Sequence, residues 1–432
     1  SNPLLAEWDT PYQTPPFSQI KLEHFEPAVD AAIACSRAEI EAIVNNPEKP
    51  TFGNTIVAME RSGELLNRVA GVFYNLMGTD ATPEMQEVAQ RIQPKMTELS
   101  NDISLNPALF ARVKAVYEQR EELELTAEEQ KVLENQYKRF VRSGAELNEE
   151  EKTRLRELNT QLSMLQLNFS QNLLHETNNT FVVVESVEEL AGLPEGNIAA
   201  AAKMAEEQGQ PGKWMFNMQR PSCNPVLQYC SNRALREKVY NAYYNRGNVD
   251  NEYDNKAISA EIVKLRLEKA KLMGFENYAR MALEERMAKT PEAVYALLDQ
   301  VWAPAVKKTR EELNDIRAEI KKEGHSFEPA GWDYMYYLDK AKRAKFAVDE
   351  QEIRNYLEIG NVMQGIFHVA GQLYGLQFKE ITSEVPSYEP TAKAYEVIDR
   401  DGKTLAIFYS DNFPRASKRA GAWCTSFRGQ SY

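Results

Sequence analysis

The sequence has few of the residues from which disulfide frameworks and metal sites are built. Its 432 residues include four cysteines, which are Cys35, Cys223, Cys230 and Cys424. They are too few and too scattered for a disulfide framework, and the spacing from Cys223 to Cys230 is not that of a zinc ribbon. We therefore expect free or buried thiols.

Histidine is equally scarce, and no two histidines lie four residues apart. The four are His24, His175, His325 and His368. A His-Glu-x-x-His zinc helix needs two imidazoles one turn apart, with the Glu as general base. His175 is followed by a Glu, but Asn179 stands where the second ligand would be, and Asn is a poor zinc ligand. We interpret His175 as a residue near a helix end and predict no metal ligand in this chain.

Other signatures of catalysis and of membrane insertion are missing as well. The sequence has no Gly-x-Ser-x-Gly elbow, phosphate-binding loop or dinucleotide fingerprint. It has no run of about 18 apolar residues that could span a bilayer. The formal net charge of −13 argues against nucleic acid or an anionic membrane as partner, because both attract a basic face. An acidic cavity would instead favour the ammonium group or the basic side chains of peptides.

The composition, 43% hydrophobic and 27% charged, is that of an ordinary soluble protein. The length suffices for about two or three domain-sized cores. The first residues, Ser1-Asn2, are typical of an expression scar, so a preceding targeting segment is not excluded. We expect a cytoplasmic monomer, with a periplasmic or cell-envelope location as the alternative if a signal peptide has been removed.

Hydrophobic periodicity and capping residues predict a mainly α-helical fold. The best-defined helix is 148–176, in which Asn148 can act as N-cap and leucines repeat by three and four. We expect helix 126–141 as its packing partner, with a free coiled-coil dimer as the alternative. The rival architecture is an α-solenoid. Further helices are predicted at 23–44, 51–77, 224–281 with a break at 245–247, 290–322 and 356–374, and from residues 82 and 332 onward.

Short stretches of strand character interrupt the helices. Residues 395–398 and 404–409 alternate around Asp401-Gly402, a dipeptide typical of a tight hairpin turn, and predict a two-stranded ribbon. We expect residues 180–184 and 213–218 to add two strands to it. We predict four regions. They are an N-terminal helical domain (3–178), a small β-containing insertion (179–222), a second helical region (223–390), and the ribbon with the start of a further region (391–432).

The densest cluster of special residue types follows the ribbon. Asp411, Arg415 and Arg419 fall four apart, so in a helix they would line one face. The small Gly421-Ala422 pair would let another backbone approach closely, and Trp423 could wall that space. The alternative is a solvated basic face with a small-residue packing contact.

This cluster resembles a known family. The order Phe-Tyr, Asp, Arg, Lys-Arg, Gly-Ala-Trp and Phe-Arg within residues 408–428 is similar to the segment before the zinc motif in the bacterial branch of the thimet oligopeptidase and peptidyl-dipeptidase family. The family's zinc motif is absent from these 432 residues, so the chain looks like a member without roughly its C-terminal third. Residues 391–432 would then contain the start of its truncated catalytic region. Other fragments of the family pattern occur in the right order: Pro15-Pro16-Phe17, Glu23-His24-Phe25, Pro50-Thr51-Phe52, 140–174, Gly274-Phe275, 287–291 and Trp332-Asp333.

The resemblance implies an elongated helical bundle that lines one wall of a deep channel, with a small antiparallel sheet. Such a channel admits short unfolded peptides and excludes folded proteins. It implies zinc as the cofactor of the complete parent enzyme, held outside this chain. It further implies a substrate-binding strand at Gly421, Ala422 and Trp423. The residues expected to support this strand are Asp411, Arg415, Lys418 and Arg419.

The predicted function is therefore that of the N-terminal portion of a zinc-dependent oligopeptidase or peptidyl-dipeptidase, with this chain alone inactive. The alternative is a non-catalytic helical interaction or scaffold protein related to the peptidases. The sequence leaves open whether the parent releases C-terminal dipeptides or cuts internally.

Overall fold

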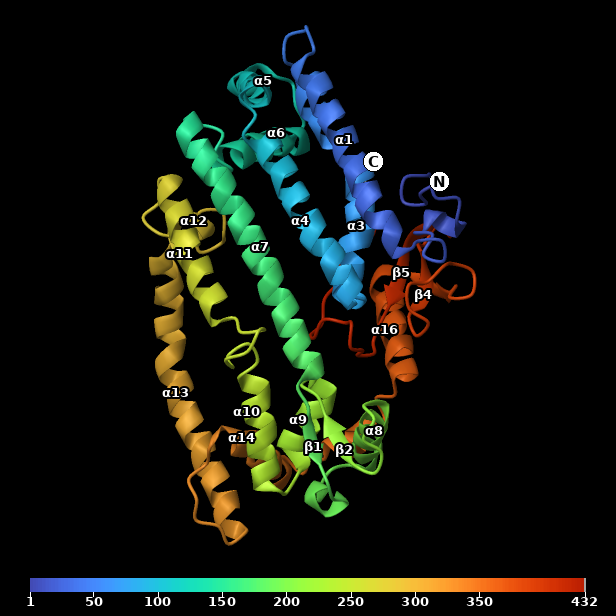
Figure 1. The fold of residues 1–432 in the computed structure, drawn as a ribbon, viewed down its shortest axis with the longest axis vertical. Coiled ribbons are helices and arrows are strands. Elements are labelled where there is room, and N and C mark those ends of the chain that lie inside the picture. Colours follow the sequence, from blue (N-terminus) through green and yellow to red (C-terminus); the bar gives the residue numbers. More distant parts are fainter. Residues whose placement is uncertain (431–432) are drawn as a thin grey trace.

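The computed structural model describes residues 1–430 and confirms a mainly α-helical fold with two small antiparallel sheets. Figure 1 shows an elongated molecule whose long helices run roughly along its longest axis. The helices are α1 Phe25–Val44, α2 Ala58–Arg61, α3 Glu64–Thr79, α4 Pro83–Ser104, α5 Pro107–Glu118, α6 Ala127–Arg142, α7 Glu149–Asn179, α8 Glu195–Glu207, α9 Arg220–Tyr229, α10 Arg233–Tyr244, α11 Lys256–Leu272, α12 Tyr278–Leu283, α13 Pro291–Lys322, α14 Gly331–Phe346, α15 Glu350–Arg354 and α16 Ile359–Tyr374.

The helix predicted at 51–77 is divided, which the sequence interpretation missed. A π-helical turn, Phe52–Val57, leads into α2, and Thr51 caps the turn by accepting a hydrogen bond from the Asn54 N–H. The chain then breaks at Gly63, whose φ of +75° lies outside the helical region. The Gly63 N–H donates to the Glu39 carboxylate of α1 at 2.6 Å. A tertiary contact therefore holds the break between α2 and α3.

The N-terminal arm belongs to the largest hydrophobic core. Leu4, Trp8 and Phe17 are buried against the apolar faces of α1, α3 and α4. The proline-rich start of the chain thus crosses these helices in turns and short 3-10 turns, at Pro11–Gln13 and Leu22–His24, and not as an extended segment.

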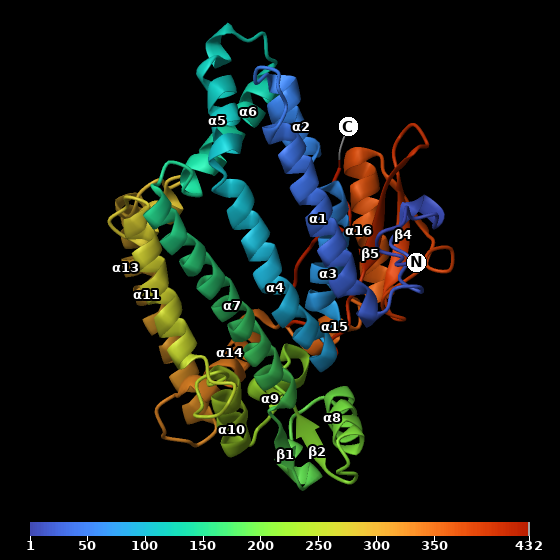
Figure 2. The same cartoon turned by 45° about the horizontal axis from the view of Figure 1, so that its top comes forward.

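The long helix α7 begins where it was predicted but packs elsewhere. Asn148 caps it by accepting from the Glu151 N–H. The expected pairing with α6 is wrong: α7 lies between α4 and α11, and α6 packs on α5 (Figures 1 and 2). The reason is that the leucine stripe, with Leu158 and Leu162 buried, meets an apolar face of α11, while α6 turns its own buried residues into the core around α5.

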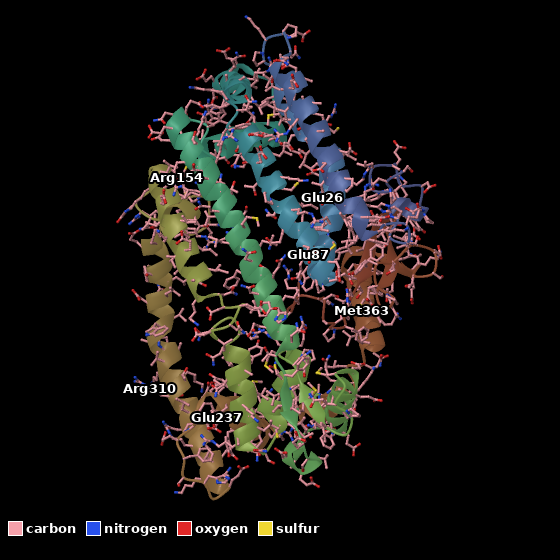
Figure 3. The ribbon with its side chains drawn as sticks, in the orientation of Figure 1. Glu26, Glu87, Arg154, Glu237, Arg310 and Met363 are labelled. Atoms are coloured by element: carbon pink, nitrogen blue, oxygen red, sulfur yellow. The ribbon has the colours of Figure 1, made fainter. Side chains whose placement is uncertain are left out.

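Polar and charged groups tie α4 and α11 to the neighbouring long helices. Figure 3 labels two of the residues involved, Arg154 on α7 and Glu26 on α1. The Arg154 guanidinium donates to both carboxylate oxygens of Glu268 on α11, at 2.6 and 3.0 Å. Glu26 accepts from Arg91 of α4 at 2.8 Å. These ion pairs are half-exposed and fix orientation more than they stabilise.

The two short early strands form their own sheet. β1 Val182–Val184 pairs antiparallel with β2 Trp214–Phe216 and with no other strand among the described residues. The expectation that they join the ribbon is wrong, because Val182, Val184 and Phe216 are buried in a separate core with residues of α9 and α10.

The predicted ribbon is confirmed and gains a third strand. β4 Lys393–Ile398 and β5 Thr404–Ser410 form an antiparallel hairpin, with Tyr395 opposite Phe408. Gly402 has a φ of +78° at the turn. β3 Gln377–Glu380 lies on the other side of β4, so the order is β3-β4-β5 and β5 is an edge strand. Across residues 1–430 no helix is long and apolar enough to cross a membrane.

Candidate functional site

The segment after β5 is neither helix nor strand. Residues 411–430 run in turns and irregular backbone, so the expected helical face and the expected strand at Gly421-Ala422 are both wrong as secondary structure. Pro414 has no N–H for a helical hydrogen bond. A single turn follows it, in which the Lys418 N–H donates to the Arg415 carbonyl at 3.0 Å. Gly421 has a φ of +103°, which no extended strand contains.

The four-residue spacing of Asp411 and Arg415 nevertheless marks a real pair. The Arg415 Nη1 and Nη2 atoms donate to the two Asp411 carboxylate oxygens at 3.0 and 2.9 Å. Lys418 Nζ donates to the Asp411 carboxylate at 3.0 Å, and to the carbonyl oxygens of Asp411 and Phe413 at 2.9 and 3.0 Å. One buried carboxylate and two cations therefore hold residues 411–418 together without a helix.

Further acids complete this network. Arg415 lies 3.3 Å from Asp80, which follows α3, and 3.6 Å from Glu389. The Tyr388 hydroxyl donates to Asp411 at 3.2 Å. Burial by itself would raise the pKa of Asp411, but hydrogen bonds from Arg415 and Lys418 outweigh it, so the pKa lies below its ordinary value. The Asp411 carboxylate thus stays ionised at neutral pH.

The segment then crosses the surface of α3. The Ala81 N–H donates to the Ser417 carbonyl at 2.8 Å, and the Arg419 N–H donates to the Gly78 carbonyl at 2.9 Å. Asn75 Nδ2 donates to the Ser426 carbonyl at 3.0 Å. The ring of Trp423 covers Gly78, and the Phe427 carbonyl lies against Gly71.

The sequence analysis did not predict the contact between this segment and α3. Gly71, Asn75 and Gly78 follow one another by four and three residues, so they share one face of α3. Such a run of small residues on a helix is a signal of close backbone approach. The run could have indicated that another segment contacts α3, but not which segment does so.

The predicted substrate-binding residues lie at the surface of this segment. Gly421 and Ala422 are exposed and Trp423 is half-buried. A methyl group added at Gly421 would meet no atom within 4 Å, so the backbone there is open on one side. Arg419 stacks on the Trp423 ring, 4.4 Å from its centroid, and does not join the ion pairs of Asp411 as the expected helix required.

An aromatic cluster anchors the far end of the segment. The Phe427 ring lies 5.2 Å from Phe17 of the N-terminal arm, 6.0 Å from Tyr409 of β5 and 6.1 Å from Tyr388. Edge-on packing of this kind stabilises by more than the buried area alone. The cluster joins both ends of the described chain to the three-stranded sheet.

The donor set in the described part of the chain does not fit a zinc ion. No three His, Cys, Asp or Glu side chains within residues 1–430 are grouped so that they could hold a metal. His175 lies in the last turns of α7, as interpreted from the sequence, and its ring stacks on Tyr253 with centroids 3.5 Å apart. We therefore assign no metal ligand to these residues.

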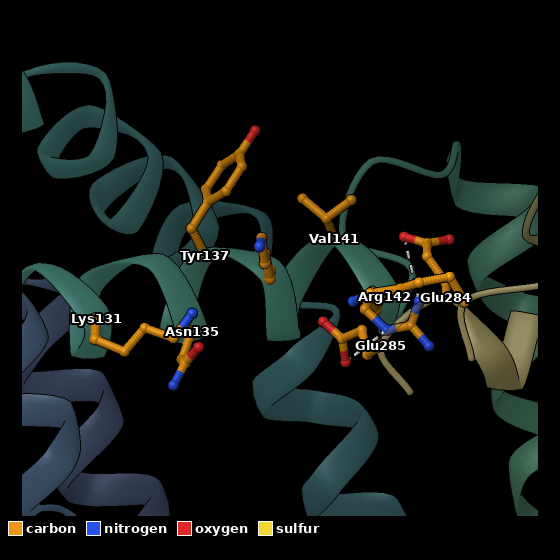
Figure 4. A pocket seen from close by; sticks show the side chains of 9 residues that line it. Lys131, Asn135, Tyr137, Val141, Arg142, Glu284 and Glu285 are labelled. Atoms are coloured by element: carbon orange, nitrogen blue, oxygen red, sulfur yellow. Dashed lines mark ion pairs between the residues drawn. The ribbon is translucent and has the colours of Figure 1, made fainter. Parts of the chain in front are cut away.

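A hollow among the described residues lies elsewhere. It has a volume of about 590 Å³ and is lined by residues of α6 and of the turn after α12. Figure 4 shows how Arg142 closes one side of it by pairing with Glu285 at 3.0 Å and with Glu284 at 3.4 Å. Four basic and two acidic side chains line it. Lys131, Lys138 and Arg142 are already engaged in ion pairs, so we assign no substrate to it.

Comparison with known proteins identifies the family. Residues 29–152 match the model described as "Neurolysin/Thimet oligopeptidase, N-terminal domain", and residues 226–431 match "Peptidase family M3". The chain is 38% identical over 431 residues to "Dipeptidyl carboxypeptidase" of Escherichia coli (strain K12), which covers 100% of this chain and 63% of that protein. It is 33% identical over 427 residues to "Oligopeptidase A" of Haemophilus influenzae, covering 98% and 62%.

A plant relative is also similar. "Organellar oligopeptidase A, chloroplastic/mitochondrial" of Arabidopsis thaliana is 30% identical over 435 residues, covering 98% of this chain and 54% of the relative. The chain thus spans a little under two thirds of the length of the two bacterial relatives. The two family models match the earlier and the later part of the chain, and both describe the family that the sequence resembles. The chain belongs to peptidase family M3.

Proposed function

We propose that this chain is part of a zinc-dependent peptidase that hydrolyses short unfolded peptides. The observation that carries the proposal is the 38% identity to a dipeptidyl carboxypeptidase along the whole chain. Zinc would polarise the scissile carbonyl and lower the pKa of the attacking water. Because residues 1–430 hold no fitting ligand set, the metal would be bound by residues outside this span.

In this proposal the present residues supply binding surface. The long helices α4, α7, α11 and α13 would form one wall of a channel. The open backbone at Gly421-Ala422 would lie beside the peptide, where N–H and C=O groups free of bulky side chains could pair with it. The ion pairs of Asp411, Arg415 and Lys418 would hold that backbone in place.

The test is Ala422→Val in a chain of the relatives' full length. Crowding the peptide should raise KM or lower kcat on a quenched peptide, while zinc content and the unfolding midpoint stay unchanged. Ala416→Val is the matched control, because Ala416 is an exposed alanine of the same segment. The products distinguish release of C-terminal dipeptides from internal cleavage.

Two outcomes would overturn parts of the proposal. If Ala422→Val costs stability and spares the kinetics, the Gly-Ala pair is only a packing contact. If the full-length, zinc-loaded protein hydrolyses no peptide, the alternative of a non-catalytic helical scaffold is supported.

A further inference from the structure

Helix α16 has an unusual combination of composition and burial. Its residues, Ile359–Tyr374, include no Asp, Glu, Lys or Arg, and none of them is buried. Surface helices of soluble proteins normally carry charged groups on the solvent side, and a continuous apolar stripe on a helix normally faces a core or a partner. The structure covers only one side of α16.

The covered side rests on the three-stranded sheet. The Phe367 ring stacks on Phe378 of β3 with centroids 4.2 Å apart and meets Tyr395 of β4 edge-on at 4.8 Å. Met363, labelled in Figure 3, approaches Ser410 at the end of β5, with its sulfur 4.0 Å from the hydroxyl. These contacts fix which face of α16 points away from the sheet.

Beside the covered side runs a regular apolar stripe. Ile359, Ile366 and Leu373 are seven residues apart, and Val362 and Val369 lie between them, so the spacing alternates between three and four. Ile366 and Val369 are each 53% exposed and Leu373 is 62% exposed. This is the seam spacing by which one α-helix packs on another. A strand would instead need alternation by two.

The surroundings of the stripe leave room for a neighbour. A methyl group at Gly365 would meet no atom within 4 Å. The side chains that flank the stripe, such as Gln364, His368 and Gln372, are polar and carry no fixed charge. Exposed apolar patches bordered in this way mark interaction sites in soluble proteins.

We propose that the α16 stripe, residues 359, 362, 366, 369 and 373, binds an α-helix from the part of the family chain that the present residues do not span. The relatives share this whole chain and extend beyond the shared part, because it covers 63% of the E. coli protein. The model of the family's N-terminal domain falls on residues 29–152, so most of the additional length follows the shared part. A second copy of this chain is disfavoured, because two bodies of charge −13 repel each other.

The inference rests on family membership and not on peptidase activity, so its test uses accessibility. Ile366→Cys is placed in the 432-residue chain and in a chain of the relatives' full length, and maleimide labelling of this position is followed by mass spectrometry. We expect labelling to be at least about tenfold slower in the longer chain, because the covering helix must open first. Ala416→Cys, an exposed position outside the stripe, should label equally in both. Equal labelling of position 366 would overturn the proposal.

A second pair of variants separates a helix partner from a second copy. In the longer chain, Ile366→Glu should expose the covering segment to protease, and Gln364→Glu on the same helix should not, because only the first buries a charge. Light scattering should find the 432-residue chain monomeric at all concentrations. A dimer that dissociates in Ile366→Glu would assign the stripe to a second copy and overturn the proposal.

Discussion

The Asp411 carboxylate and the Arg415 guanidinium form two parallel hydrogen bonds, 3.0 and 2.9 Å long, in a segment without regular secondary structure. Paired bonds of this geometry are among the stronger polar interactions in proteins. Side-chain exposure is 8% for Asp411 and 18% for Arg415, so water competes little for either group. The pair therefore holds the backbone of residues 411–415 in place, where no helical hydrogen bonds do so.

Replacing Asp411 by Asn should destabilise the fold in a pH-dependent way. The folded pKa of Asp411 lies below its ordinary value of 3.8. Its contribution to stability is thus fully present above that value and is lost as the pH falls through the lower folded pKa. We expect Asp411→Asn to cost about 2 kcal/mol at pH 7 and distinctly less near pH 3, measured by urea unfolding.

Asp250→Asn is the control for this measurement, because the Asp250 side chain is 97% exposed in its pair with Lys256. It should change the free energy of unfolding by less than about 0.5 kcal/mol. A cost of Asp411→Asn that is the same at both pH values would contradict the assigned ionisation.

Gly402→Ala should destabilise the β4/β5 hairpin. The φ of +78° is strained for any residue with a Cβ, although no atom lies within 4 Å to clash with one. We expect a loss of about 1 kcal/mol in the free energy of unfolding. Gly196→Ala makes the same chemical change in α8, where φ is helical and space is open, and should be neutral or slightly stabilising. Equal effects would show that the positive φ of Gly402 does not limit stability.

Gly71→Ala should loosen the segment that crosses α3. The new methyl group would lie 3.0 Å from the carbonyl oxygen of Phe427. Phe427 cannot shift freely, because its ring is held by the aromatic cluster. We expect chymotrypsin to cut after Trp423 or Phe427 about fivefold faster, which corresponds to about 1 kcal/mol. Gly78→Ala meets the Trp423 ring at an ordinary 3.5 Å and should leave the rate unchanged. A higher rate for both would indicate a general loosening of α3.

The exposed thiol of Cys424 should react much faster than the buried thiol of Cys223. Cys223 is buried, and burial raises its pKa to about 11, while Cys424 is exposed. Because the thiolate is the reacting form, a disulfide reagent at pH 8 should modify Cys424 within minutes and leave Cys223 until the protein unfolds. Cys424→Ser should remove the fastest phase, that of the exposed thiol. Rapid reaction of Cys223 in the folded protein would contradict its burial.

The 432-residue chain by itself should bind no stoichiometric zinc and cleave no peptide. The expectation rests on the absence of two histidines at ligand spacing anywhere in the sequence. Elemental analysis after exchange into metal-free buffer, together with a quenched-peptide assay, checks it. One zinc per chain accompanied by cleavage would refute it.

Local features were readable from the sequence because their causes are local. Asn148 and Thr82 cap α7 and α4 through side chains three residues from the N–H groups they satisfy. Asp401-Gly402 specifies its turn, and Gly375 ends α16 with a φ of +72°. The residue order after β5 was sufficient to identify the family.

How these pieces meet depends on packing between segments that are far apart in the sequence. The leucine stripe of α7 indicates that another helix packs on it, but both α6 and α11 have apolar faces that could do so. In the structure α11 packs on the stripe. The β1-β2 pair stayed apart from the ribbon because other helices bury it. Asp411, Arg415 and Lys418 were found as residue types, yet their bonds form in a turn, because Pro414 excludes the helix and the contacts with α3 and Asp80 hold the chain in another path. Such choices depend on the summed contacts of segments far apart in sequence, which no local pattern contains.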